Sequence, residues 1–137
     1  MCMQDSPHKV IIKTMTVNRS ADDVFDFFED PKCMEIGGAT KSVVKGGDGS
    51  WTFDHVSGRA KMKHAPLREA GVLDHVFIGA GLEWRVYVRM VPNYGGTTVI
   101  WTFVRPDGLS DEQFENQLKG FDPEIVLWKK ALEGRQN

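Results

Sequence analysis

The sequence predicts an α+β domain in which a curved antiparallel sheet of about seven strands wraps around a long C-terminal helix, with two short helices after the first strand. Three observations lead to this prediction: a strand-like run at residues 9–17, a period-two pattern from 39 to 106, and a helical apolar stripe from 110 to 134. The 137 residues, 41% of them hydrophobic, suit one core. We therefore expect a single domain over residues 1–137.

Local signals predict the first strand and the two short helices. Residues 9–17 are rich in Val, Ile and Thr, which favour strands. Ser20 is the expected N-cap of the first helix, and the two aspartates that follow place negative charge at its N-terminus. Pro31 should end that helix, because the residue before a proline avoids helical geometry. A second short helix over 31–36 should end at the glycine pair that follows it.

After residue 39 the pattern changes to short runs of period two separated by glycine-rich turns, which is typical of an antiparallel meander. In the run that begins at Leu82, apolar side chains alternate strictly with Glu83, Arg85, Tyr87 and Arg89, so one face of that strand belongs to the core. The expected strands are 39–45, 50–56, 59–65, 71–78, 82–91 and 97–105.

A hairpin is predicted around Ser57 and Gly58, which can form a two-residue turn. That register pairs Asp54 with Lys61 on the solvent face. It also gives the inward pairs Phe53–Met62 and Trp51–His64 and turns His55 and Ala60 inward.

An apolar stripe with gaps of four and three residues predicts one long helix over 110–134. Ser110 and Gln113 fit a capping box at its start. Pro123 should bend the helix without changing the phase of the stripe, although Asp122 and Pro123 also fit a new cap and first helical residue. The stripe consists of Phe114, Leu118, Phe121, Ile125, Trp128 and Leu132.

Charge and cysteine content exclude several classes of protein. A net charge of -2 gives no general attraction to phosphate backbones, so we expect no nucleic-acid partner. Cys2 and Cys33 have no metal-ligand spacing and are too few for a disulfide framework, so we expect no metal and a cytoplasmic location. The sequence contains no phosphate loop or dinucleotide fingerprint, so we expect no cofactor. No secretory signal or membrane-spanning apolar run is evident, so we expect no stable membrane insertion. We also expect a monomer or homodimer.

The order of elements, over roughly residues 9–133, resembles the helix-grip fold of the START/Bet v 1-like (SRPBCC) superfamily, the polyketide cyclase/dehydrase and lipid-transport group. Three segments support the likeness and look like bacterial members: 20–25, 84–93 and 108–114. The resemblance implies a hydrophobic cavity between the sheet and the C-terminal helix. Across the superfamily such cavities bind lipids, hormones or polyketides and sometimes catalyse reactions on them.

The aromatic side chains expected on the inner faces form a candidate ligand site. Three strand tryptophans and one helix tryptophan suit a flat or hydrophobic ligand, and they suit a filled core equally well. The candidate ligand-binding residues are Trp51, Phe53, His55, Met62, His64, Trp84, Val86, Trp101, Phe121 and Trp128.

Three histidines are the candidate catalytic residues. His55 and His64 turn inward, where an imidazole can bind a ligand hydroxyl or carbonyl, act as a general acid or base, or bond a neighbouring core group. Roughly 13 Å separates the two in the predicted register, too far for shared metal coordination. His75 is the better inward candidate of the Asp74–His75 pair, because adjacent strand residues face opposite sides. Glu35 either lines the cavity entrance or is a solvated charge.

Three hypotheses of function follow. The first is a binding protein for a small hydrophobic or aromatic ligand. The second is an enzyme of the polyketide cyclase or aromatase kind, in which a cavity histidine moves protons. The third is an interaction module similar to the Hsp90-ATPase-activator domains.

Overall fold

The computed structural model of the protein describes residues 6–56 and 58–135. Cys2 and the predicted turn residue Ser57 lie outside the described residues. The elements of the described part are, in chain order, β1 (Val10–Val17), α1 (Ala21–Glu29), α2 (Cys33–Ile36), β2 (Thr40–Lys45), β3 (Trp51–His55), β4 (Gly58–Leu67), the 3₁₀ turn η2 (Arg68–Ala70), β5 (Val72–Gly79), β6 (Leu82–Asn93), β7 (Gly96–Val104), α3 (Asp111–Lys119) and α4 (Phe121–Glu133).

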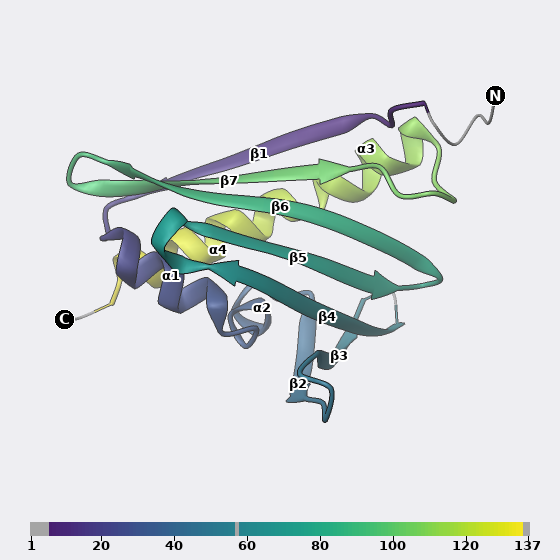
Figure 1. The fold of residues 1–137 in the computed structure, drawn as a ribbon, viewed down its shortest axis with the longest axis horizontal. Helices are drawn as coiled ribbons and strands as arrows, with labels where there is room; N and C mark the ends of the chain where they lie inside the picture. Colours follow the sequence, from purple (N-terminus) through teal and green to yellow (C-terminus); the bar gives the residue numbers. More distant parts are fainter. Residues whose placement is uncertain (1–5, 57, 136–137) are drawn as a thin grey trace.

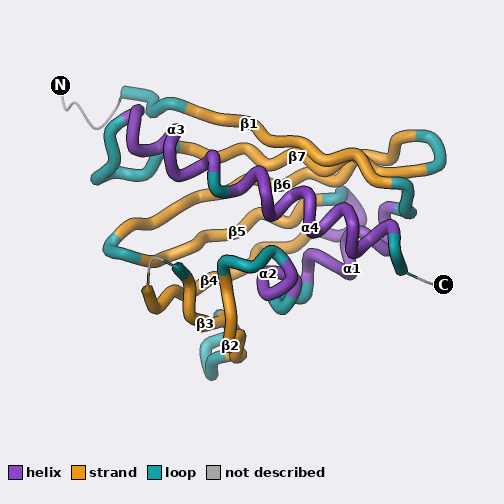
Figure 2. Tube along the Cα trace, turned by 180° about the vertical axis from the view of Figure 1, so that it is seen from behind, coloured by secondary structure: helices purple, strands orange, loops and turns teal. Residues whose placement is uncertain are grey.

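The strands form one seven-stranded antiparallel sheet in the order β1-β7-β6-β5-β4-β3-β2. Consecutive hairpins run from β2 to β7, and β1 then pairs with β7, with Val10 opposite Val104 and Val17 opposite Thr97. In Figure 1 the sheet curves, with β2 and β3 turned away from the long strands. All the α-helices lie on one face, and α3 and α4 cross it along a single line in Figure 2. The predicted α+β architecture is confirmed.

The core lies between β6, β7 and the helices. Buried and exposed side chains alternate along β6, and along β7 buried side chains alternate with half-buried ones, which confirms the predicted inner faces. The phenylalanines of α1 fill one end of this core, where Phe27 and Phe28 meet edge to face with ring centres 5.0 Å apart. The inward residues of the two strands are Trp84, Val86, Val88, Met90, Val99, Trp101 and Phe103.

The β3–β4 hairpin corrects the predicted register by two residues. Asp54 pairs with Arg59, their charged groups 3.0 Å apart, and not with Lys61. Lys61 instead reaches Asp48 at 3.0 Å. The register differs because the strand begins already at Gly58, whose φ of +117° is readily available only to glycine, so the turn lies one residue earlier than predicted.

A register shift of two residues gives each residue a new cross-strand partner but leaves its side chain on the same face of the sheet. Trp51 therefore pairs with Met62 rather than with His64, and Phe53 pairs with Ala60 rather than with Met62. The inward facing of Phe53, Ala60 and Met62 is confirmed by their burial.

The C-terminal helix is interrupted, and the interruption lies at Gly120 rather than at Pro123. α3 ends at Lys119 and α4 begins at Phe121. Pro123 has no N–H to donate to the carbonyl of Lys119, and its ring crowds that carbonyl, so the regular hydrogen bonding fails one turn before the proline. Gly120 keeps helical dihedrals (φ −68°, ψ −16°), so the two segments continue in nearly one direction.

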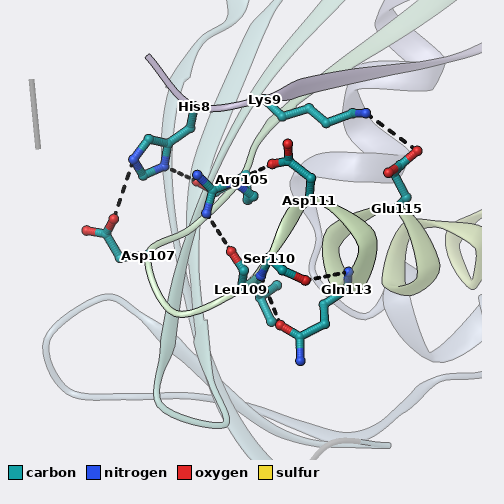
Figure 3. Close-up of polar contacts among 9 residues, drawn as sticks. All are labelled: His8, Lys9, Arg105, Asp107, Leu109, Ser110, Asp111, Gln113 and Glu115. Atoms are coloured by element: carbon teal, nitrogen blue, oxygen red, sulfur yellow. Dashed lines mark hydrogen bonds and ion pairs between the residues drawn. The ribbon is translucent and has the colours of Figure 1, made fainter. Parts of the chain in front are cut away.

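The connection from β7 to α3 is fixed by Arg105 (Figure 3). Its guanidinium donates to the carbonyl of Leu109 at 2.5 Å and pairs with the Asp111 carboxylate at 2.9 Å. The backbone carbonyl of Arg105 accepts a 2.7 Å hydrogen bond from the His8 ring, and the backbone N–H of Arg105 donates to the Lys9 carbonyl at 2.9 Å. These contacts join the residues at the start of β1 to the β7–α3 connection and set the position from which the C-terminal helix crosses the sheet.

The predicted capping box at the start of α3 is confirmed, because Ser110 accepts from the Gln113 N–H at 3.1 Å and the Gln113 side chain accepts from the Ser110 N–H at 2.9 Å. Replacing Ser110→Ala should lower the free energy of unfolding by about 1 kcal/mol, since one helical N–H loses its acceptor. Urea denaturation measures this difference. Ser110→Asp, which keeps an acceptor, should retain most of the stability, and an Asp variant as unstable as the Ala variant would contradict the capping role.

Candidate functional site

A cavity of about 500 Å³ lies between the inner face of the sheet and the C-terminal helix. Its walls come from β4, β5, β6 and β7 on one side and from α1, α2, α3 and α4 on the other. Residues 39, 40, 55 and 56, at the start of β2 and the end of β3, are also part of the lining. The protein therefore has an open space at the position where the resemblance implied one, rather than a completely filled core.

Aromatic side chains form most of the wall toward β6, β7 and α4. Trp101 and Trp128 are stacked with ring centres 5.9 Å apart and planes at 27°, and Phe121 meets both edge-on. Trp84 lies farther along the sheet, and its ring centre is 5.8 Å from that of Phe114. The predicted residues that line the cavity are His55, Met62, His64, Trp84, Val86, Trp101, Phe121 and Trp128.

Trp51 and Phe53, also expected in the ligand site, do not line the cavity. They belong to a second apolar cluster with Val43, Ala60 and Met62, under the turned-away end of the sheet. Phe53 is completely buried there, and Trp51 is half-buried. Alternation along β3 predicts which face these rings occupy, but the curvature of the sheet determines whether that face reaches the cavity.

His64 and His75 form a pair across the cavity wall. They are direct partners in the β4–β5 register, and their rings meet edge to face with centres 5.5 Å apart. The Nδ1 atom of His75 lies 3.4 Å from the carbonyl of Leu73. The pKa of each imidazole is lowered to about 4, mainly by burial, and in His64 the neighbouring His75 contributes to this shift. Both rings are therefore neutral at pH 7. The sequence predicted that both histidines face inward, but no register between their strands was predicted, so the pairing is a new finding of the structure.

His55 lines the cavity at the end of β3, with its ring centre 5.3 Å from that of Phe77. Burial lowers its pKa. In the observed register His55 is opposite Gly58, so His64 lies six strand positions farther along, roughly 20 Å at the rise of a strand. The two histidines are thus farther apart than predicted, and they cannot contact the same small polar group.

Glu124 is the functional candidate that the sequence analysis did not identify. It lies in the first turn of α4 and lines the cavity, and burial raises the pKa of its carboxyl to about 7. Cys33 lines the cavity nearby, where burial raises the pKa of its thiol, so the thiol stays protonated and unreactive.

A helical pattern in the sequence contains this residue. Gln117, Phe121, Glu124 and Trp128 follow each other at gaps of four, three and four, and all four line the cavity. Phe121 and Trp128 also belong to the apolar stripe that predicts the helix, and Gln117 and Glu124 lie beside that stripe. Polar residues at helical spacing next to an apolar stripe were therefore the available signal.

Two other acidic candidates have structural roles. Glu35 accepts the N–H of Val43 at 3.0 Å, at the irregularity in β2 where Ser42 has a φ of +59°. Asp74 accepts the N–H of Val88 at 2.8 Å and pairs with Arg89 at 2.7 Å. Neither carboxylate lines the cavity.

Within residues 6–56 and 58–135, no group of three or more His, Cys, Asp or Glu side chains could bind a metal ion together. The same part of the chain contains no helix long and apolar enough to cross a membrane.

A curved seven-stranded antiparallel sheet, two short helices after β1 and a long C-terminal helix over an apolar cavity define the helix-grip fold of the Bet v 1-like superfamily. The protein has this fold.

Comparison with solved structures supports the same assignment. The chain is similar to the crystal structure of Ara h 8.0201, with a TM-score of 0.69 and 14% identity over 93% of this chain and 99% of that one. It is similar to a protein from Chromobacterium violaceum (TM-score 0.72, 14% identity, 94% and 100% of the two chains) and to XoxI from Bacillus cereus (TM-score 0.71, 12%, 91% and 96%). No protein-family model and no curated protein matches the sequence.

The histidine pair should make stability depend on pH. Because both folded pKa values, about 4, lie below the ordinary value of 6.5, the unfolded chain binds protons that the folded protein does not. The contribution of the neutral rings to stability is complete above pH 6.5 and is lost as the pH falls toward 4. Unfolding free energies measured between these limits should fall by up to about 1.4 kcal/mol per pH unit for each proton taken up. Replacing both rings, with His64→Gln and His75→Gln, should reduce that slope, and an unchanged slope would contradict the assignment.

Proposed function

We propose that the protein binds a small hydrophobic or aromatic molecule, of lipid or polyketide type, in the cavity between the sheet and the C-terminal helix. The observation that carries the proposal is the cavity itself. Its volume of about 500 Å³ falls within the usual range of ligand sites, and its walls are mostly apolar with a few polar groups. The shared helix-grip fold supports the proposal as well.

The wall chemistry favours a ligand with flat or extended apolar surface. Trp84, Trp101 and Phe121 present aromatic rings to the space, and each favourable ring–ring contact adds about 0.5–1.5 kcal/mol beyond the burial of area. Met62 can adapt to an irregular ligand, because its unbranched side chain has several accessible rotamers. His55 and the other cavity histidines supply hydrogen bonds that orient the ligand.

A second candidate function, catalysis of the polyketide cyclase or aromatase kind, draws support from the three cavity histidines His55, His64 and His75. A pKa of about 4 makes His64 and His75 weak bases at pH 7, far from the matched value that favours general acid–base catalysis. Binding is therefore the better-supported function. Turnover of a poly-keto substrate that is abolished by His55→Ala or His64→Ala, with substrate affinity unchanged, would reverse this preference.

The third candidate, an interaction module similar to the Hsp90-ATPase-activator domains, predicts a stable protein complex without a ligand. Native mass spectrometry separates it from the first, because a binding protein should retain a small molecule and an interaction module need not. The same spectra would test the prediction of a monomer or homodimer.

Filling the cavity should abolish binding of a neutral hydrophobic probe such as N-phenyl-1-naphthylamine. Val86 points into the cavity from β6, so Val86→Trp places an indole where the probe would lie. We expect the dissociation constant, measured by probe fluorescence, to rise about tenfold or more. Circular dichroism should confirm that the variant is folded.

Val91→Trp is the matched control. Val91 lies on the same strand but faces outward with 44% of its surface exposed, so this substitution should leave the affinity unchanged. Equal affinity of wild type and both variants would locate the probe outside the cavity and contradict the proposed site.

A further inference from the structure

Glu124 is the only carboxyl among the described residues that line the cavity. It extends from the first turn of α4 toward the end of α2, where it lies against Gly37. A Cβ atom on Gly37 would come within 3.1 Å of the Glu124 carboxylate oxygen Oε2, a contact closer than normal packing allows. The glycine therefore provides the space that this carboxyl occupies.

The carboxyl of Glu124 has no hydrogen-bond or ion-pair partner in the part of the chain that the structure describes. Within the described residues no group donates a hydrogen bond to it and no cation pairs with it. A carboxyl that loses water without gaining a donor is unstable in its charged form, which is why burial alone raises its pKa to about 7. A ligand that brings a donor would supply the missing hydrogen bond.

The rest of the cavity wall offers nothing to an anionic ligand. Among the described lining residues there is no lysine or arginine. Lys13 lies on β1, which packs against α4, and its Nζ atom is already paired with the Asp122 carboxylate at 2.8 Å. The cavity histidines have lowered pKa values and are neutral at pH 7 or above. A ligand carboxylate in this cavity would therefore meet one like charge and no opposite charge.

We infer that Glu124 determines the class of ligand: the cavity accepts apolar molecules whose head is a hydrogen-bond donor, a hydroxyl or an amine, and rejects carboxylates such as fatty acids. The inference rests on the proposed binding function and specifies the polar end of the ligand. A hydroxyl head donates to the carboxylate in a charge-assisted hydrogen bond, and an ammonium head adds an ion pair in a low-dielectric environment.

Three ligands of equal chain length test the inference: 1-decanol, decylamine and decanoate, each displacing N-phenyl-1-naphthylamine at pH 8.5. At this pH the Glu124 carboxyl is mostly ionised, decylamine is cationic and decanoate is anionic. We expect decylamine and decanol to displace the probe, and decanoate to bind at least about tenfold more weakly than decanol. Decanoate that binds as tightly as decanol would overturn the inference, and this comparison needs only the wild-type protein.

Glu124→Gln keeps the size of the side chain and an acceptor oxygen but removes the charge. In this variant decylamine should bind about tenfold more weakly, decanoate should bind more tightly, and decanol should change little. Glu83→Gln is the control, because Glu83 lies on the outer face of β6 and pairs with Arg85 at 3.0 Å. Ratios of the three affinities that are identical in wild type and Glu124→Gln would overturn the role of Glu124.

The experiment distinguishes failure of this inference from failure of the proposed function. If the neutral probe and decanol bind but decanoate binds equally well, the cavity binds apolar molecules without the selection inferred for Glu124. If neither the probe nor any of the three ligands binds, the binding function is wrong and the inference fails with it.

Discussion

An aromatic contact between the C-terminal helix and one side of the sheet determines where the cavity lies. Trp101 of β7 and Trp128 of α4 stack, and Phe28 of α1 meets both rings edge-on. The Trp128 indole donates to the Cys33 carbonyl at 2.8 Å, which satisfies its buried N–H. The helix is thereby held toward β1 and β7. Side chains from β4 and β5, among them His75, line the opposite wall, and the space between the two walls is the cavity.

The fold could be predicted from the sequence because its signals are local and periodic. Alternation along β6, the capping box at Ser110 and the stripe along the last helix each follow from spacing alone. The position of the helix break and the β3–β4 register could not be predicted with the same accuracy. Both depend on glycines: Gly120 forms the interruption caused by Pro123, and Gly58 begins a strand where a two-residue turn was expected.

The candidate site was predicted only in part. The sequence pattern predicts on which face of a strand a side chain lies, but the curvature of the sheet determines which of the inward side chains reach the cavity. Phe53 faces inward as predicted, yet the bend of the sheet buries it in a separate cluster. The His64–His75 pair depends on the β4–β5 register, which the strand boundaries alone do not specify. Glu124 was missed because it lies between the apolar positions of the predicted stripe, where a charged side chain is ordinarily solvated.

The contact between Trp128 and Cys33 joins residues 95 positions apart in the chain. During synthesis the sheet, including the aromatic inner face of β6 and β7, leaves the ribosome before α4 does. Until that helix arrives, Trp101 lacks the cover of Phe121 and Trp128, and exposed apolar surface of this kind promotes aggregation and chaperone binding. The helix that closes the cavity therefore also ends the interval in which the nascent protein exposes this surface, so a chain truncated before Trp128 would leave part of its aromatic inner face open to solvent.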